Sequence, residues 1–501
     1  MTDRNLGALN ADLRDSPLPA LIAPQEEGPA LSCSYAQLNY QADAIGRALL
    51  ARGFEPGSRV AIVALNSVPY VAALLGILRA GLVAVPVNIK LPTDTLHAIL
   101  RDSGAVLAFG DDAQRGRLPP ALPRITLSDD ALRAFAEPGP LTPYQARPQD
   151  LALLLYTSGS SGMPKGVRLT HDSHLWVVQT RRDAGELLDE RLLIAAPFYH
   201  MNALALILLS LSSGVSAVIL PQFTAPAYIR AIRDFRCSWL TAVPPMIAMM
   251  LREKALLANS DLTCVRVVRM GSAPVSASLL AQIRRLLPAA RIINAYGTTE
   301  GGPVVFGPHP EGLEPPPLAT GYPHPRVQVR LRAADGALSD YGVLEINSPA
   351  LMQGYHQRPD ITPPFTPDGY YRTGDVFRRE ETGFYTFVGR HDDMFVCGGE
   401  NIYPSEVEQL LERHPDVQQA CVVPVEDEIK GAKPVAWVIL RPGQQCDEAS
   451  LKAFALTHGA AYLHPRRIWL LDRFPLAGTN KIDRSALKAE AARRMQTNEQ
   501  R

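Results

Sequence analysis

The segment from Tyr156 to Val167 combines residue types that can hold a chain of phosphates. Its sequence, YTSGSSGMPKGV, has three glycines, four serine or threonine hydroxyls and one lysine, Lys165. Glycines let backbone N–H groups approach a ligand closely, and successive N–H groups in turns form anion-binding concavities. The hydroxyls add donors and the lysine adds a point charge. The pattern predicts polyphosphate binding, with a flexible Gly/Ser surface loop as the alternative.

This segment is not a Walker A loop. No Gly-Lys-Ser/Thr triplet follows the required four-residue gap, and Pro164 interrupts the passage from a loop into a helix. The apolar run 151–155 comes directly before the segment. We therefore expect a loop that leaves a buried strand.

A second segment, 292–300, has the sequence IINAYGTTE and follows a strand-like run. Tyr296 can stack on a purine face, and Thr299 can donate a hydrogen bond to a phosphate. Glu300 is a hard oxygen ligand of the kind that Mg2+ prefers. Without context, a hairpin end rich in turn-forming residues is an equal alternative.

Three further polar residues can complete a nucleotide site. Asp375, in the segment YRTGD, can accept from both hydroxyls of a ribose, as acidic residues do in dinucleotide sites. Arg390 can reach the same nucleotide, and Lys481 lies in a polar turn. The alternatives are a helix cap or solvated charge for Asp375, a surface ion pair for Arg390, and a solvated side chain for Lys481.

Composition limits the function classes. At 501 residues we expect at least two domains, and 50 basic side chains balance 50 acidic ones, so no broad field attracts nucleic acid or an acidic membrane. Six scattered cysteines form no CxxC pair, which argues against a disulfide framework and a structural zinc site. The N-terminus lacks a secretion signal, and serines interrupt the apolar stretch 203–220, which favours a helix, a turn and a strand. We expect a soluble cytoplasmic protein without a membrane span.

The first part of the chain alternates strand and helix signals. Between 59 and 109, β-rich runs alternate with helical patterns, including a helix over 68–80 that Ser67 caps and Gly81 ends. The alternation resumes over 191–294, after a polar, proline-rich connection over 115–147. Such alternation predicts an α/β fold with parallel sheets covered by helices.

The character of the sequence changes from residue 321 onward. Alternating runs over 327–331 and 342–347 predict a small antiparallel β unit. A shorter α+β block follows, with a helix over 404–413 and strands over 420–424 and 436–440. We place a domain boundary close to Asp392.

In this order and spacing, the segments resemble the adenylate-forming superfamily of acyl- and aryl-CoA synthetases, adenylation domains and beetle luciferases. The similarity runs from Leu31 to Leu487. Residues 394–406 and the pair Asn480-Lys481 are most similar to bacterial aryl-CoA ligases of the chlorobenzoate type. Val396 stands where many members have lysine, and Asn480 where they have glycine. Both departures also occur in that branch.

The resemblance implies an N-terminal adenylation domain over 1–390, with parallel sheets, flanking helices and a small β unit. It also implies a small mobile α+β domain over 391–501 that carries the catalytic lysine. The implied substrates and cofactors are a carboxylic acid, ATP, Mg2+ and coenzyme A. The acid attacks the α-phosphorus of MgATP to give acyl-AMP and pyrophosphate, and a thiol then attacks the acyl carbon and releases AMP.

Carried over residue by residue, the resemblance implies three groups of site residues. The catalytic group is Lys481, His200 and Glu300, with Glu300 also the metal ligand. The ATP-binding group is Thr157, Ser158, Gly159, Ser160, Ser161, Lys165, Asn294, Ala295, Tyr296, Gly297, Thr298, Thr299, Asp375 and Arg390. The acid-binding group is Met201, Asn202, Ala242, Gly271, Ser272, Ala273 and Gly302, with Trp176, Val243 and Pro303 as further candidates.

The same resemblance assigns individual roles. Lys481 would bridge the incoming carboxylate and the α-phosphate, where its charge stabilises developing negative charge. His200 would gate the acyl pocket from the thiol tunnel. Asp392 would be the hinge about which the C-terminal domain turns after adenylation, presenting Gly398 and Gly399 to the thiol.

The acid and the thiol acceptor are less defined. The pocket candidates are mostly apolar or small, and no carboxylate is placed to pair with an α-amino group, so we expect an aromatic or short-to-medium aliphatic acid. Asn202 can bond a hydroxyl or carbonyl of the acid, or backbone. The leading hypothesis is a carboxylic acid–CoA ligase. The alternatives are an acyl-AMP ligase loading a carrier protein in trans, a non-catalytic adenylate-binding protein and a luciferase-like oxygenase. Monomer and homodimer both remain open.

Overall fold

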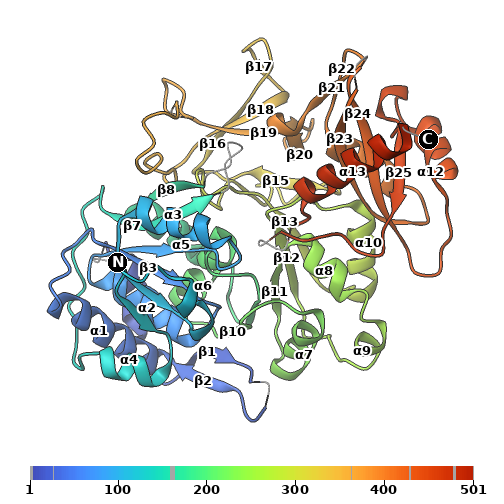
Figure 1. Ribbon diagram of the computed structural model, residues 1–501. Helices are drawn as coiled ribbons and strands as arrows, with labels where there is room; N and C mark the ends of the chain where they lie inside the picture. The colour runs from blue at the N-terminus through green and yellow to red at the C-terminus, as the bar shows by residue number, and fades with distance from the viewer. Residues whose placement is uncertain are drawn as a thin grey trace.

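The computed structural model describes residues 4–25, 27–157, 164–362, 364–427, 430–477 and 481–499. Over these ranges the chain forms four sheets with flanking helices, which confirms the predicted α/β class. Figure 1 shows the N-terminal part in blue to green and the C-terminal part in orange to red beside it. None of the described helices is long and apolar enough to cross a membrane.

Two sheets are built mainly from parallel strands. The six-stranded sheet has the order β6-β5-β3-β4-β7-β8, with β3 (Arg59–Val63), β4 (Val83–Pro86), β5 (Ala105–Gly110), β6 (Arg124–Thr126), β7 (Leu151–Thr157) and β8 (Lys165–Thr170). The seven-stranded sheet has the order β13-β12-β11-β9-β10-β1-β2, with β1 (Pro19–Ala23), β2 (Leu31–Ser34), β9 (Leu192–Ile194), β10 (Ala217–Ile219), β11 (Trp239–Ala242), β12 (Val267–Gly271) and β13 (Arg291–Ala295). Only the pairs β1–β2 and β7–β8 in these two sheets are antiparallel in the described residues.

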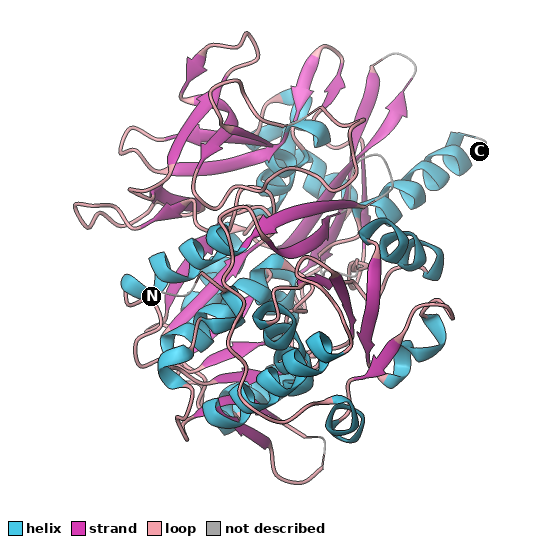
Figure 2. Ribbon diagram, turned by 90° about the vertical axis from the view of Figure 1, so that its left-hand side faces the viewer, coloured by secondary structure: helices cyan, strands magenta, loops and turns pink. Residues whose placement is uncertain are grey.

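Helices cover these sheets, as Figure 2 shows for the lower part of the molecule. The α-helices of the N-terminal part are α1 (Tyr35–Ala51), α2 (Val68–Arg79), α3 (Thr93–Ser103), α4 (Asp129–Phe135), α5 (His171–Asp183), α6 (Met201–Ser213), α7 (Ala225–Phe235), α8 (Pro244–Met250), α9 (Lys254–Ala258) and α10 (Ala277–Leu286). Short 3-10 turns are η1 (Leu6–Ala8), η2 (Ala11–Leu13) and η3 (Asp112–Arg117). The connection predicted over 115–147 therefore contains β6 and α4, which its polar composition concealed.

Local signals explain the predicted helices. Ser67 Oγ accepts from Tyr70 N at 3.2 Å and starts α2, and Gly81 follows its end with a left-handed φ of 77°. The apolar stretch 203–220 divides into α6, a turn at Gly214 and β10, as expected. Helix α6 is buried on nearly all sides because it shares one apolar core with strands of both parallel sheets.

The third sheet is antiparallel and has the order β14-β15-β20-β19-β18-β16-β17. Its strands are β14 (Phe306–Gly307), β15 (Ala319–Pro323), β16 (Gln328–Arg332), β17 (Leu338–Ser339), β18 (Tyr341–Asn347), β19 (Tyr371–Arg379) and β20 (Tyr385–Arg390). The sequence predicted an antiparallel unit from two runs, 327–331 and 342–347, and the observed sheet has seven strands. Strand β13 packs against β15, so this sheet adjoins the end of the seven-stranded one.

The remaining residues form an α+β unit after η4 (His391–Asp393). Its sheet has the order β22-β21-β24-β23, with β25 on β24, and consists of β21 (Phe395–Cys397), β22 (Glu400–Ile402), β23 (Val417–Asp427), β24 (Gly431–Leu440) and β25 (Arg467–Leu470). Its helices are α11 (Pro404–Glu412), α12 (Glu448–His458), α13 (Arg484–Glu499) and the turn η5 (Ala461–Leu463). Helix α11 packs against β20 and α10, and Arg441 Nη2 donates to Ser278 Oγ at 2.9 Å, so the unit is docked on the N-terminal part.

Candidate active site

Thr157, at the end of β7, contacts Glu300, which follows β13. Thr157 ends β7 and pairs across the antiparallel ladder with Lys165, the first residue of β8. Its Oγ1 donates to Glu300 Oε1 at 3.4 Å. The residues that connect β7 to β8 include Ser158, Gly159, Ser160 and Ser161, which lie outside the described residues. The structure therefore fixes both ends of the predicted phosphate loop beside the predicted metal ligand.

Tyr355 links Lys165 to Glu300. Its hydroxyl donates to Glu300 Oε1 at 3.3 Å, and Lys165 Nζ lies 4.6 Å from the centroid of its ring. Burial and the charge of Glu300 raise the pKa of Tyr355, so its hydroxyl stays protonated and remains a donor. The ring orients the lysine through a cation–π contact. Tyr355 thus holds a cation and an anion of the site in fixed positions.

Asp375 lies between Tyr296 and Arg390. It pairs in register with Arg390 across β19 and β20, and its Oδ1 lies 3.5 Å from Arg390 Nε. Tyr296 donates from its hydroxyl to Asp375 Oδ2 at 2.5 Å. Burial raises the pKa of Asp375, while the Tyr296 hydrogen bond and the Arg390 charge oppose that rise. A carboxylate has about four acceptor positions, so these two contacts leave capacity for ribose hydroxyls.

Tyr296 also belongs to an aromatic cluster. Its ring centroid lies 4.8 Å from that of Phe377 and 5.9 Å from that of Phe306. This packing holds the ring in place, with its hydroxyl turned to Asp375. The structure therefore gives Tyr296 a positioning contact with the carboxylate in addition to the purine stacking expected from the sequence.

Lys481 from the C-terminal unit enters the same site. The bridge between Leu476 and Ile482 and the hydrogen bond from Ala477 N to Lys481 O, 2.8 Å long, hold its backbone. Burial lowers the pKa of Lys481, Arg390 lowers it further, and Asp375 raises it. Its positive charge also lowers the pKa of His200. Because such effects weaken with distance, the Lys481 charge lies within electrostatic range of residues of the N-terminal part in this domain arrangement.

His200 is the N-cap of α6, but its side chain makes no capping bond. Burial, followed by the charges of Lys481 and Lys90, lowers its pKa to about 3, so the imidazole is neutral at pH 7. Its Nε2 is buried and has no hydrogen-bond partner in the described part of the chain. The ring packs edge-on against Tyr199 with centroids 4.7 Å apart. The half-buried His200 therefore keeps one ring nitrogen without a hydrogen-bond partner among the described residues.

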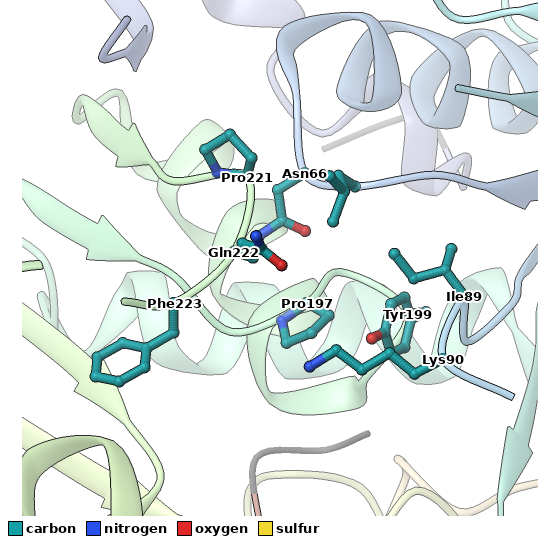
Figure 3. A pocket seen from close by; sticks show the side chains of 9 residues that line it. Asn66, Ile89, Lys90, Pro197, Tyr199, Pro221, Gln222 and Phe223 are labelled. Atoms are coloured by element: carbon teal, nitrogen blue, oxygen red, sulfur yellow. The ribbon is translucent and has the colours of Figure 1, made fainter. Parts of the chain in front are cut away.

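A small pocket is lined by Tyr199, the residue before this histidine. It is lined in part by Lys90, Pro197, Tyr199 and Phe223. Figure 3 shows the Lys90 side chain extending beside Tyr199 toward Pro197. The pocket therefore holds the positive charge of Lys90 next to Tyr199, which precedes His200 in the sequence.

The backbone at the predicted acid site is tightly packed. Ser272, directly after β12, has a φ of 65°, a left-handed conformation that is uncommon for residues other than glycine and concentrates at functional sites. A Cβ on Gly302 would lie 2.5 Å from Ala350 Cβ, and one on Gly297 would lie 2.7 Å from Gly302 O. Gly271 pairs with Ala295 across β12 and β13. Close packing accounts for these glycines without a ligand, and Ala273 completes this small-residue segment.

Several predicted residues are engaged with other protein groups. Asn294 Nδ2 donates to Leu318 O at 2.8 Å, and Thr298 Oγ1 accepts from Gly301 N at 2.8 Å, so both shape the chain around the site. Met201 Sδ lies 3.4 Å from His174 Nε2. Ala242 is fully buried in the apolar core under α7 and α8. Neighbouring Thr299 makes no side-chain hydrogen bond to another described residue and stays a predicted α-phosphate ligand.

Asn202 contacts a residue that the sequence interpretation did not include. Its Oδ1 accepts from Arg269 Nη1 at 2.9 Å. Arg269 and Tyr355 are the two main omissions. Arg269 is a lone arginine in a strand, and Tyr355 lies outside the recognised motifs. Neither residue has a neighbouring sequence pattern that indicates a function, so their roles appear only in tertiary contacts.

The predicted hinge and thiol tunnel lie on the exposed side of the C-terminal unit. Asp392, in η4, is exposed, and Gly398 and Gly399 form the tip of the β21–β22 hairpin with φ values of 64° and 92°. A Cβ on Gly399 would have no neighbour within 4 Å. The hairpin needs glycine for its positive φ angles. In this arrangement the tip faces open space, so a role in thiol transfer requires another orientation of the unit.

Comparison with known proteins places this geometry in a family. A model described as AMP-binding enzyme matches residues 16–356, and one described as the AMP-binding enzyme C-terminal domain matches residues 406–481. The feruloyl-CoA synthase of an Amycolatopsis species is 32% identical over 483 residues, covering 95% of this chain and 96% of the relative. The fatty acid–[acyl-carrier-protein] ligase ScoC of Streptomyces coeruleorubidus is 32% identical, covering 92% and 93%.

A solved structure supports the same assignment. ATP-bound MatB from Rhodopseudomonas palustris matches with a TM-score of 0.87 and 26% identity, covering 98% of this chain and 99% of that one. The resemblance to adenylate-forming enzymes is confirmed. The chain belongs to the AMP-binding enzyme family.

Proposed function

We propose that this protein is an ATP-dependent carboxylic acid–CoA ligase that works through an acyl adenylate. In the first step a carboxylate oxygen of the acid attacks the α-phosphorus of ATP, and the bond to the β-phosphate oxygen breaks to release pyrophosphate. In the second step the sulfur of CoA attacks the acyl carbon, and AMP leaves with the electron pair of the broken C–O bond. The observation that carries this proposal is the half-buried Lys481, whose pKa responds to Arg390 and Asp375 and whose charge lowers the pKa of His200.

In this proposal ATP binds with its phosphates at Lys165 and its ribose near Arg390. Thr157 and Lys165 hold the β- and γ-phosphates, and Asp375 accepts from the ribose hydroxyls with Arg390 beside it. ATP enters as its Mg2+ complex. Glu300 suits that cation because its carboxylate lies with the Thr157 and Tyr355 hydroxyls, which are oxygen groups only.

Lys481 acts in the first step. Two anions, the carboxylate and the α-phosphate, must approach one another, and negative charge builds up between them as the new bond forms. An ammonium partly removed from solvent, as that of Lys481 is, interacts with that charge more strongly than a fully solvated one does. Neutral His200 adds no competing charge to the acyl side of the site.

The second step uses a different domain arrangement. We assign residues 1–390 to the adenylation domain and 391–501 to a mobile domain that turns about Asp392. The turn withdraws Lys481 and brings the Gly398–Gly399 hairpin toward the acyl-AMP, where a narrow thiol arm passes close to backbone. His200 then separates the acyl pocket from the thiol.

A carrier protein is the second candidate acceptor. The relative ScoC is named as a ligase for acyl carrier protein and is as similar to this chain as the CoA ligase relative, at 32% identity. CoA and a carrier protein present the same type of thiol arm. The proposed acid for either acceptor is aromatic or short-to-medium aliphatic.

AMP and pyrophosphate release over a panel of aryl and aliphatic acids, with MgATP and with or without CoA, tests the function. CoA-dependent AMP release on at least one acid is the expected result. Acid-dependent pyrophosphate release that CoA does not accelerate would contradict a CoA ligase and support the carrier-protein acceptor.

A further inference from the structure

Arg269 is a buried cation whose only side-chain hydrogen bond in the described part of the chain goes to a neutral group. It lies on β12, is 7% exposed, and donates from Nη1 to Asn202 Oδ1 at 2.9 Å. No described carboxylate lies within ion-pair distance of it. The nearest candidate, Glu186, accepts from Arg181 Nε at 2.6 Å and Nη2 at 2.5 Å, which occupies both of its oxygens.

Several buried polar atoms around Arg269 have no partner among the residues that the structure describes. They are Asn202 Nδ2, Thr241 Oγ1 and Arg181 Nη1. Thr241 pairs in register with Arg269 across β11 and β12, so both side chains point to the same face of the sheet. Native proteins satisfy nearly all buried polar groups, so such a cluster requires an explanation.

The orientation of Asn202 follows from its contact with Arg269. A guanidinium can only donate, so the Asn202 amide must direct its oxygen toward Arg269. Its NH2 group then points away and remains an unused donor. Together with the guanidinium, this amide leaves unused donors and a positive charge where β12 meets the start of α6.

The charges in this region do not balance. Arg181 and Arg269 are both buried, and among the described residues Glu186 is the one carboxylate whose charge acts on both. Burial and Arg181 lower the pKa of Arg269 to about 10, while Glu186 raises it, so Arg269 is still charged at pH 7. An uncompensated buried charge is strongly unfavourable, and a bound anion would compensate it.

The cluster lies deeper than the reacting end of the proposed acid site. Arg269 precedes Gly271 by two residues along β12, which corresponds to about 7 Å of strand. Asn202 follows His200 by two residues at the start of α6. An acid whose carboxylate meets Lys481 and whose body passes His200 and Gly271 therefore directs its far end toward Arg269.

We propose that Arg269, Asn202 and Thr241 form a subsite for an anionic oxygen group at the far end of the acid substrate. The substrate is then a dicarboxylic acid or a carboxylic acid with a distal sulfonate. This inference rests on the proposed ligase function and specifies its substrate class. The site accommodates the second anion through the Arg269 guanidinium, the Asn202 amide N–H and the Thr241 hydroxyl.

Pairs of acids with the same skeleton test the subsite in the unmodified enzyme. Suitable pairs are glutarate and pentanoate, terephthalate and 4-methylbenzoate, and 3-sulfopropanoate and butanoate. Acid-dependent pyrophosphate release gives kcat/KM for each acid. For the best pair we expect the acid with the distal anion to be favoured by at least about a hundredfold, because the analogue leaves buried donors unpaired.

Arg269→Met then assigns the preference to one residue. It should remove most of that ratio by lowering kcat/KM for the anionic member, with the KM for ATP unchanged. Arg269→Lys should restore part of the ratio, and Arg284→Met, at an exposed arginine on α10, should leave it unchanged. Thermal unfolding of each variant separates loss of the fold from loss of the subsite.

Three results would overturn parts of the account separately. Equal kcat/KM within every pair, in an enzyme that turns over at least one acid, would refute the subsite and leave the ligase intact. A preference that persists in a folded Arg269→Met variant would refute the role of Arg269. No acid-dependent pyrophosphate release from any pair would count against the proposed ligase itself.

Discussion

Replacing Tyr296 by phenylalanine removes one hydrogen bond from the buried carboxylate of Asp375 and keeps the aromatic packing. The bond is 2.5 Å long, and the Tyr296 ring is held by Phe377 and Phe306. A hydrogen bond to a charged group contributes about 1.5–3 kcal/mol. If the bond fixes the orientation in which Asp375 accepts from the ribose, its loss raises the KM for ATP by about tenfold to about a hundredfold.

The same substitution changes the pH dependence in a defined direction. Burial raises the pKa of Asp375 and the Tyr296 hydroxyl lowers it, so Tyr296→Phe raises it further. Only the ionised carboxylate accepts from both hydroxyls of the ribose. Activity is lost as the pH falls through the pKa of Asp375, so the acid limb of the variant lies at higher pH than that of the unmodified enzyme.

Initial rates of pyrophosphate release at varied ATP and pH measure both effects. Tyr322→Phe, on β15 of the same sheet, is the matched control and should leave the KM for ATP and the acid limb unchanged. A Tyr296→Phe variant with an unaltered KM for ATP and an unaltered acid limb would refute the positioning role of Tyr296.

Three other substitutions or conditions test the remaining roles. Glu300→Gln should raise the Mg2+ concentration needed for half-maximal pyrophosphate release, because it removes an anionic oxygen ligand; an unchanged Mg2+ dependence would exclude Glu300 as the ligand. Burial and Arg390 lower the pKa of Lys481, and activity is lost as the pH rises through that pKa. The alkaline limb of kcat/KM for the acid should therefore lie below the ordinary lysine pKa of about 10.4. A profile that stays flat above that pH would contradict a role for the Lys481 ammonium. Asp392→Pro should hold the docked arrangement by restricting φ, so that acyl-AMP forms while CoA-dependent turnover falls; normal CoA-dependent turnover would reject the hinge.

The sequence predicted those parts of the fold that depend on neighbouring residues. The Ser67 cap, the end of α2 at Gly81 and the division of 203–220 into helix, turn and strand all follow from local rules. The antiparallel sheet was predicted only in part. Its strands pair across long loops, as β14 does with β15 and β15 with β20, and such pairings leave no periodic signal.

The site shows the same limit. Glu300, Asp375 and Lys481 stand in recognisable motifs, and the structure brings Asp375 and Lys481 into one electrostatic environment. Tyr355 and Arg269 stand in no motif, and their roles come from contacts with residues 55 and 67 positions away. The choice of acid depends on such contacts, which explains why the sequence defined the reaction type better than the substrate.

Separate measurement of the two half-reactions in Lys481→Ala tests whether Lys481 acts in adenylation alone. We expect formation of acyl-AMP to fall by at least about a hundredfold, because the positive charge at the reacting phosphate is lost. Transfer of the acyl group from supplied acyl-AMP to CoA should remain close to that of the unmodified enzyme, because Lys481 leaves the site before that step. Equal loss of both half-reactions would contradict the assignment of Lys481 to adenylation alone.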